Sequence, residues 1–339
     1  NIYYHDYDLA HMVLSLKPFG CMPSTQSDAV QAAVMELNKD MIFLPLETAG
    51  EGETNAQSRV LMSLGDARIK AKTEIRNARK KVTATMEEMK AWVDGMRSFV
   101  YYVGQCLDKE ALAVDEEERA LYKGFGDLLT PLVKAYCAQR GFDVCVEAVQ
   151  VYGGYGYIKE YPVEQLVRDC KITSIYEGTD GIQAMDLLGR KLGMVNGRVF
   201  MNFLGEIQKT IAMARETKGL EELTAEVERA VNRLGEVALH IGKSALSPKF
   251  KVAFAHAFPF MEVMGDVVMA WMLLWRAALA KQKLEGGARK KDVDFYEGQL
   301  KTAEFFIGTE LPATMGKMNA IADGCAAAIQ ISDEGFGGI

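Results

Sequence analysis

The sequence predicts an all-α protein, built as an antiparallel helical bundle with an additional C-terminal helical domain. Long runs of good helix formers contain few prolines and carry apolar residues three and four positions apart, which is the spacing of one helix face. Alternating strand-like patterns are scarce, and no series of them is long enough to form a central β-barrel. At 339 residues, of which 49% are apolar, the chain can bury substantial cores.

The first expected element is an amphipathic helix over residues 27–44, "SDAVQAAVMELNKDMIFL". Ser27 and Asp28 are candidate caps, and apolar residues that include Val30 mark one face at helical spacing. Pro45 and the run "ETAGEGETN" then interrupt the pattern with glycines and acidic residues. We therefore expect an N-terminal helical segment over residues 1–53, ending at this boundary.

Two long helical stretches follow, over residues 57–109 and 116–150, with a charged loop between them. Such a pair predicts an antiparallel hairpin within a domain of residues 54–192. Further helices are expected in an additional domain of residues 193–339, and they include residues 219–245, 257–275 and 294–306.

The run "AFPFMEVMGDVVMAWMLLW" is apolar enough to raise the alternative of a membrane span. It carries Pro259, Glu262 and Asp266, and each acid near the centre of a bilayer would cost about 2.5–3.5 kcal/mol. We therefore expect a methionine-rich core helix and no transmembrane segment. The chain opens without the charged and apolar pattern of a signal peptide, which predicts a cytoplasmic protein.

The composition argues against several classes of function. A formal net charge of −7 makes nucleic acid an unsuitable partner, because binding to it needs a basic surface. The six cysteines form no CxxC pair, and the chain has four histidines. This pattern favours neither a disulfide framework nor a metal site, and it indicates reduced thiols.

A glycine-rich motif, "QVYGGYGY", ends the second long helical stretch. Gly153 and Gly154 follow the expected helix end near Tyr152, and glycines there allow the left-handed backbone that caps a helix. Their lack of side chains would also let a flat or phosphorylated ligand lie against the backbone. From this motif alone we favour capping, and contact with a ligand stays open.

The stretch "CKITSIYEGTDGIQAMDLLGRKL" places an acid just outside a predicted helix. Thr179 is expected to cap that helix, with Asp180 at the positive end of its dipole. Glu177 is then either one more acid stabilised by the dipole or a functional carboxylate. Tyr176 and Gly178 beside it indicate a tight, partly apolar site, in which free amides could polarise a bound carbonyl.

Taken as one pattern, "QVYGGYGYIKEYPVEQLVRDCKITSIYEGTDGIQ" closely resembles the C-terminal helical domain of the acyl-CoA dehydrogenases. In that family a glycine-rich stretch, an Arg-Asp pair and the motif "IYEGT" follow one another in this order. The resemblance extends over residues 90–191. The helices beyond it resemble the subgroup with an added C-terminal domain, which includes methylthiopropionyl-CoA dehydrogenases.

The resemblance implies an FAD enzyme of fatty acid metabolism that removes two hydrogens from the α and β carbons of an acyl-CoA. It implies that Glu177 takes the α proton while the β hydrogen leaves as hydride to the flavin, and that electron-transfer flavoprotein is the acceptor. The family's binding positions fall on two sets of residues: Gln150, Gly153, Gly154, Thr179, Asp180 and Gly181 for the cofactor, and Tyr176 and Gly178 for the substrate.

One part of the family's architecture has no visible counterpart in the sequence. Members carry an N-terminal helical domain and a central β-barrel that holds the flavin ring. We therefore expect a homodimer or a dimer of dimers in which Gln150, Gly153 and Gly154 face a flavin held by a neighbouring subunit, or a partner chain that supplies the barrel. The alternative function is a non-catalytic helical scaffold or assembly subunit.

Overall fold

The computed structural model describes residues 12–17, 30, 35–36, 42–47 and 53–337 of the chain. The chain divides into two compact units, Asn1–Thr83 and Ala84–Ile339. Helix α3 (Glu53–Leu112) runs through the division between them. Most of the described residues are helical, which confirms the predicted all-α class.

The first unit contains a sheet of two parallel strands, β1 (Val13–Lys17) and β2 (Phe43–Glu47), which pair in register along their whole length. Their sequences, "VLSLK" and "FLPLE", place apolar residues at alternate positions. Leu44 and Leu46 therefore point to the same face of β2, and both are buried. In the described part of the chain this pair is the one sheet, so no barrel is seen there.

These strands correct the expected N-terminal helix. Within residues 27–44, the structure describes positions 30, 35–36 and 42–44. Positions 30 and 35–36 are helical, whereas strand β2 begins at Phe43. Pro45 lies inside this strand and not at a break. Proline has no N–H to donate, and an edge strand tolerates it because some of the N–H groups of such a strand are unpaired. The other positions of the expected helix lie outside the described residues. A five-residue alternation is too short to be recognised beside a longer helical pattern.

The predicted hairpin is confirmed in the second unit. After α3, the chain returns through three consecutive helical segments: α4 (Glu116–Pro131), the π-helical turn η1 (Leu132–Tyr136) and α5 (Cys137–Tyr152). Asp115 caps α4 by accepting from the backbone N–H of Glu118 at 2.9 Å. Pro131 has no N–H for the helix ladder, and the chain passes there into the wider π turn.

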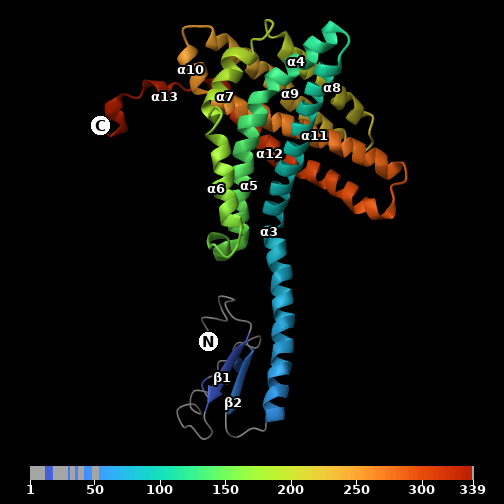
Figure 1. Ribbon diagram of the computed structural model, residues 1–339, viewed down its shortest axis with the longest axis vertical. Helices are drawn as coiled ribbons and strands as arrows, with labels where there is room; N and C mark the ends of the chain where they lie inside the picture. Colours follow the sequence, from blue (N-terminus) through green and yellow to red (C-terminus); the bar gives the residue numbers. More distant parts are fainter. Residues whose placement is uncertain (1–11, 18–29, 31–34, 37–41, 48–52, 338–339) are drawn as a thin grey trace. The chain divides into compact units, whose positions relative to one another are not determined.

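Shorter elements follow and carry both motifs of interest: η2 (Gly153–Tyr157), α6 (Val163–Lys171), η3 (Ile172–Ser174), α7 (Asp180–Asp186) and η4 (Leu187–Lys191). α6 runs back along α5 as the second arm of a short helical hairpin (Figure 1). The glycine-rich motif therefore forms the turn of this hairpin, and the Glu177 loop follows its second arm.

The rest of the second unit consists of four longer helices and four short segments: α8 (Arg198–Arg215), α9 (Glu221–Ala245), α10 (Phe250–Ala255), α11 (Ala257–Glu285), η5 (Lys290–Asp292), α12 (Val293–Asp323), α13 (Ala327–Gln330) and η6 (Asp333–Phe336). α11 packs against α8, α9 and α12, which makes it the central helix of this part. The helix expected over residues 294–306 continues well beyond its predicted end, through Pro312.

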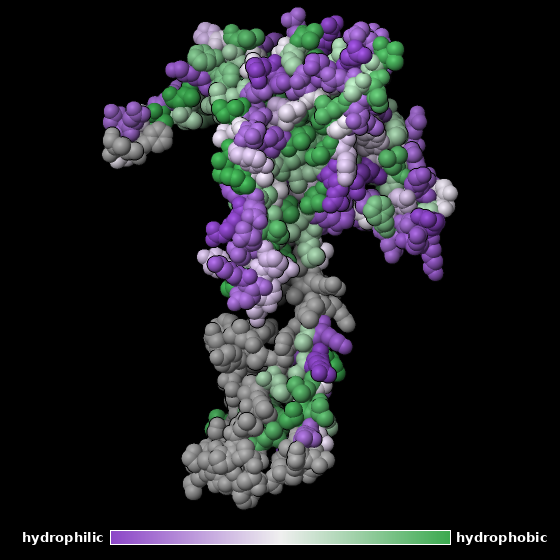
Figure 2. Space-filling model, viewed as in Figure 1, coloured by the Kyte–Doolittle hydropathy of each residue, from purple (hydrophilic) through white to green (hydrophobic). Residues whose placement is uncertain are grey.

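Helix α11 is the one helix in the described part of the chain that is long and apolar enough to cross a membrane. However, 83% of its most apolar stretch is buried against this unit, so the expected core helix is confirmed. Trp271 is fully buried, and its indole N–H donates to Thr210 Oγ1 at 2.8 Å. On the face visible in Figure 2, hydrophilic side chains are interspersed with hydrophobic ones.

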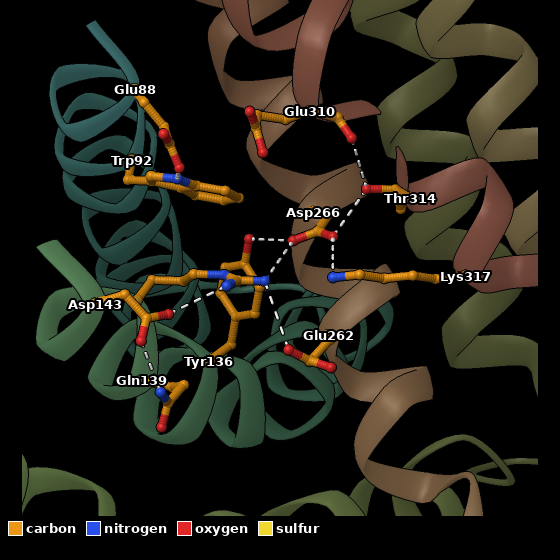
Figure 3. A network of polar contacts seen from close by, with 11 residues as sticks. Glu88, Trp92, Tyr136, Gln139, Asp143, Glu262, Asp266, Glu310, Thr314 and Lys317 are labelled. Atoms are coloured by element: carbon orange, nitrogen blue, oxygen red, sulfur yellow. Dashed lines mark hydrogen bonds and ion pairs between the residues drawn. The ribbon is translucent and has the colours of Figure 1, made fainter. Parts of the chain in front are cut away.

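Asp266 lies in the middle of this apolar helix, where its carboxylate and four partner side chains form the centre of a larger polar network (Figure 3). Its Oδ1 accepts from the Tyr136 hydroxyl at 2.8 Å, and its Oδ2 accepts from the Thr314 hydroxyl at 2.8 Å. Arg140 Nη2 lies 3.4 Å from Oδ1, and Lys317 Nζ lies 3.9 Å from Oδ2. A buried carboxylate needs such partners because it has lost its hydration.

The network joins helices on both sides of residue 192. Tyr136 and Arg140 belong to η1 and α5, whereas Asp266 and Thr314 belong to α11 and α12. Burial, and then the nearby Asp266 charge, raise the pKa of Tyr136, so its hydroxyl remains a donor. From residue 84 onward, the two regions that the sequence predicts as domains share one core.

Candidate functional site

The loop that carries Glu177 ends in a capped helix. Thr179 Oγ1 accepts from the backbone N–H of Ile182 at 3.4 Å, and Asp180 occupies the first turn of α7, so the predicted helix start is confirmed. Before the cap, φ is 55° at Glu177 and 92° at Gly178. A positive φ at a glutamate is uncommon and costs free energy, so neighbouring contacts must hold the loop.

Lys134 of η1 provides contacts of this kind. Its ammonium group donates to the Gly178 carbonyl oxygen at 2.5 Å and lies 3.9 Å from Asp180 Oδ1. It also lies 5.9 Å from the centroid of the Tyr176 ring. One cation thus contacts the chain on both sides of Glu177 and fixes the direction of the loop.

Sequence reasoning missed Lys134, although the residue left a signal. It is the one charged residue in the run "LLTPLVKAYC", and most of its neighbours there are buried. A cation among buried residues needs a polar partner. Its partner, Gly178, is 44 positions away, and sequence spacing gives no means of locating it.

The electrostatics of the loop centre on Asp180. Burial raises the pKa of its carboxyl group, while the charges of Lys134 and Lys171 act in the opposite direction. Asp180 Oδ1 is buried and has no hydrogen-bond donor. Lys134 Nζ, 3.9 Å away, is its ion-pair partner.

Glu177 itself is exposed, and Tyr176 has 51% of its surface accessible. The tight, partly apolar surroundings that the sequence led us to expect are not formed by the described residues. A ligand or another chain would have to enclose the carboxylate.

The second group of expected site residues lies at the C-terminal end of α5. Gly153 has φ 61° and ψ −142°, a conformation that favours glycine, and its N–H donates to the Gln150 carbonyl oxygen. This confirms capping for Gly153. At Gly154, no atom lies within 4 Å of the position that a Cβ would occupy. The fold itself does not require glycine there, so contact with a ligand stays open.

The two groups of residues do not lie together in the described structure. Gln150 and Gly153 lie at the turn of the α5–α6 hairpin, whereas Glu177 follows its other end (Figure 1). The nine residues of α6 between them span about 13 Å. Contact with both groups therefore requires a long ligand or two copies of one ligand.

The contrast between the two glycines predicts different results of substitution. We expect Gly154→Phe to leave the free energy of unfolding nearly unchanged, since the new side chain enters open space, but to weaken FAD binding. Gly153→Ala should lower the free energy of unfolding by about 1–2 kcal/mol, because alanine is strained at positive φ. Urea denaturation and flavin titration measure the two effects. A large loss of stability with unchanged flavin affinity in Gly154→Phe would show that Gly154 serves only to end the helix and does not contact FAD.

Two family descriptions match the chain. Residues 76–192 match "Acyl-CoA dehydrogenase, C-terminal domain", and residues 203–332 match "Acetyl-CoA dehydrogenase C-terminal like". The chain belongs to the acyl-CoA dehydrogenase family. The first match ends at residue 192 and the second begins at residue 203. The Asp266 network therefore joins the two matched regions.

Curated acyl-CoA dehydrogenases show how much of such an enzyme the chain represents. Butyryl-CoA dehydrogenase of Syntrophomonas wolfei is 31% identical over 72% of this chain and 40% of its own length. The 3-methylmercaptopropionyl-CoA dehydrogenase of Ruegeria pomeroyi is 32% identical over 69% of this chain and 39% of its own length. The chain thus spans about 40% of the length of these relatives.

A solved structure shows that the fold is shared. The acyl-CoA dehydrogenase of Bacillus anthracis, complexed with FAD, has a TM-score of 0.50 and 19% identity to this chain. The likeness covers 75% of this chain and 43% of that one. At this identity the comparison supports the helical fold of the acyl-CoA dehydrogenase C-terminal region.

Proposed function

We propose that the chain provides the C-terminal catalytic region of an FAD-dependent acyl-CoA dehydrogenase, with Glu177 as the base that takes the α proton of an acyl-CoA thioester. The observation that carries this proposal is the loop geometry. An acid stands at positive φ directly before the N-terminus of α7, and Lys134 holds the next carbonyl group. Backbone strain of this kind is concentrated at functional sites.

The reaction is α,β-dehydrogenation, in which the α carbon loses a proton and the β carbon loses a hydride. A carboxylate can take the α proton when the thioester carbonyl is polarised, because negative charge then develops on that oxygen. The N-terminal amides of α7 suit this task. Bound FAD supplies the hydride acceptor. An acyl chain that covers Glu177 would desolvate its carboxylate and increase its basicity.

The described residues fit the edge of an FAD site. Gln150 is exposed, and the open space at Gly154 would admit a flat or phosphorylated group. Thr179 and Gly181 are exposed on either side of Asp180. Because these regions are separated by the length of α6, we propose that they contact different parts of FAD or different FAD molecules.

The proposed assembly completes the site with a second polypeptide, either another copy in a homodimer or dimer of dimers, or a partner chain with a β-barrel. Tyr152 and Tyr155 beside Gly154 are 51% and 63% exposed, and exposed aromatic residues suit burial in such an interface. Electron-transfer flavoprotein as acceptor is proposed on the family resemblance, and the cytoplasm as location is proposed on the cysteine pattern.

The contacts of Lys134 predict a positioning role in this reaction. Lys134→Met should lower kcat by about 10- to 100-fold with a smaller change in KM. The loop would lose the hydrogen bond from Lys134 to the Gly178 carbonyl oxygen, and Glu177 would move away from the α carbon of the substrate. Lys134→Arg should restore part of the activity. The control is Lys171→Met. The Lys171 charge, like that of Lys134, acts to lower the pKa of Asp180, but its ammonium group lies over the Phe142 ring. Equal kcat in Lys134→Met and the unsubstituted protein would contradict this role.

The cheapest test is flavin content and its reduction by substrate. The purified assembly should absorb as a flavoprotein, and butyryl-CoA added without oxygen should bleach the flavin. A stable assembly that binds no FAD would instead support the alternative of a helical scaffold. That alternative is kept because Glu177 is exposed in the described structure. A monomer that binds FAD would contradict the shared site.

A further inference from the structure

Two cysteines face each other across the α5–α6 hairpin. Cys145 lies seven residues before the end of α5 at Tyr152, and Cys170 lies seven residues after the start of α6 at Val163. In an antiparallel helix pair, positions equally far from the connection stand at similar heights. The Cys170 sulfur is also the neighbouring group whose charge acts on the Cys145 thiol.

Gly141 allows the second helix to approach closely. It lies one turn before Cys145 on the same face of α5. Cys170 Sγ lies 3.6 Å from the position that a Cβ would occupy at Gly141. The Cys170 sulfur is thus packed directly on the Gly141–Cys145 face of α5. A disulfide requires two closely packed positions of this kind, because its Cα atoms lie within about 7 Å of each other.

The two sulfurs differ in their surroundings. Both residues are partly exposed, so a small oxidant can reach them. Burial, and then the neighbouring Cys170 sulfur, raise the pKa of the Cys145 thiol to about 11. Cys145 therefore stays protonated at neutral pH. We take Cys170 as the sulfur that meets an oxidant and Cys145 as the partner that reacts second, an order that serine variants test.

We propose that Cys145 and Cys170 form a redox-sensitive dithiol that hydrogen peroxide converts into a disulfide. The Cys170 sulfur attacks peroxide, the O–O bond breaks, and a sulfenic acid and one water form. The Cys145 sulfur then attacks the Cys170 sulfur, so that an S–S bond forms, the S–O bond breaks and a second water leaves. Two thiols lose two electrons and two protons, and one peroxide becomes two waters. Exchange with a dithiol reverses the reaction.

The disulfide would lock a hairpin that connects both candidate site regions. Its turn carries Gln150 and Gly154, and its second arm leads through η3 to Glu177. The cross-link should raise the melting temperature, because it restricts the unfolded chain. The chemistry needs the two thiols and peroxide, so it stands or falls independently of the proposed dehydrogenase function.

Peptide mapping of the purified assembly tests the proposal directly. The protein is treated with hydrogen peroxide, free thiols are alkylated, and tryptic peptides are analysed by mass spectrometry without reduction. Trypsin cleaves after Lys159 and Arg168, so the two cysteines fall in separate peptides, 141–159 and 169–171. We expect these peptides to be linked, two hydrogens lighter than the free pair, and to separate after treatment with dithiothreitol.

Serine variants test the order of events. Cys145→Ser should leave Cys170 as a sulfenic acid that dimedone traps, whereas Cys170→Ser should leave Cys145 as an alkylated thiol. Cys325 is exposed, and Cys325→Ser should leave the link intact. Full alkylation of both Cys145 and Cys170 under conditions that oxidise Cys325 would overturn the proposal. Because the mapping uses the unsubstituted protein, this result does not depend on the folding of any variant.

Discussion

Replacing Glu177 with glutamine is expected to abolish acyl-CoA dehydrogenation, with a loss of at least about 100-fold, and to leave the flavin content unchanged. Positioned acid–base groups contribute about 10²- to 10⁴-fold to rates, and an amide of the same shape cannot accept the α proton. Glu177 is exposed and its loop is held through the Gly178 carbonyl, so the substitution removes a charge without removing packing. Turnover of butyryl-CoA measures the loss, and flavin released by denaturation measures the cofactor.

Glu160→Gln is the matched control for this experiment. Glu160 is also an exposed acid, but it lies in the connection between α5 and α6, away from the capped helix α7. We expect full activity in this control. Full turnover in Glu177→Gln would remove Glu177 as the base. A loss of flavin from Glu177→Gln would show that Glu177 helps to retain the cofactor.

Replacing Asp266 with alanine is expected to lower the free energy of unfolding by about 3–5 kcal/mol, because it removes the acceptor of two hydroxyl groups and the most buried of the three carboxylates that pair with Arg140, the others being Asp143 and Glu262. The Asp266 side chain is 4% exposed. Urea denaturation followed by circular dichroism measures the change. The loss should appear in the unfolding of residues 84–339 as one unit.

Thr314→Val is the control for Asp266. It removes one neutral donor to the same carboxylate and keeps the volume of the side chain, so we expect a loss of about 1 kcal/mol. The difference between the two variants reports the loss of the Arg140–Asp266 ion pair together with the acceptor of the Tyr136 hydroxyl. Equal losses in Asp266→Ala and Thr314→Val would show that Arg140 is satisfied without Asp266.

Most helices of the second unit could be predicted because their signals are local. The cap at Thr179 acts three residues away on Ile182, and the glycine after α5 ends the helix through its own φ angle. Apolar spacing predicted the core helix α11, and burial confirms it. The N-terminal prediction failed because β1 and β2 are separated in sequence, and strand pairing leaves little local signal.

The sequence by itself determined the helical class, the capped start of α7 and the presence of an acid just before it. The tertiary structure decided which groups meet: Lys134 contacts Gly178 across 44 positions, and Asp266 contacts Tyr136 across 130. It also decided that the Gln150 and Glu177 regions lie at opposite ends of the α5–α6 hairpin. Caps and helix faces arise from groups that lie within a few residues of one another in the sequence. The long-range contacts depend on how whole helices pack, which the spacing of residues along the sequence does not encode.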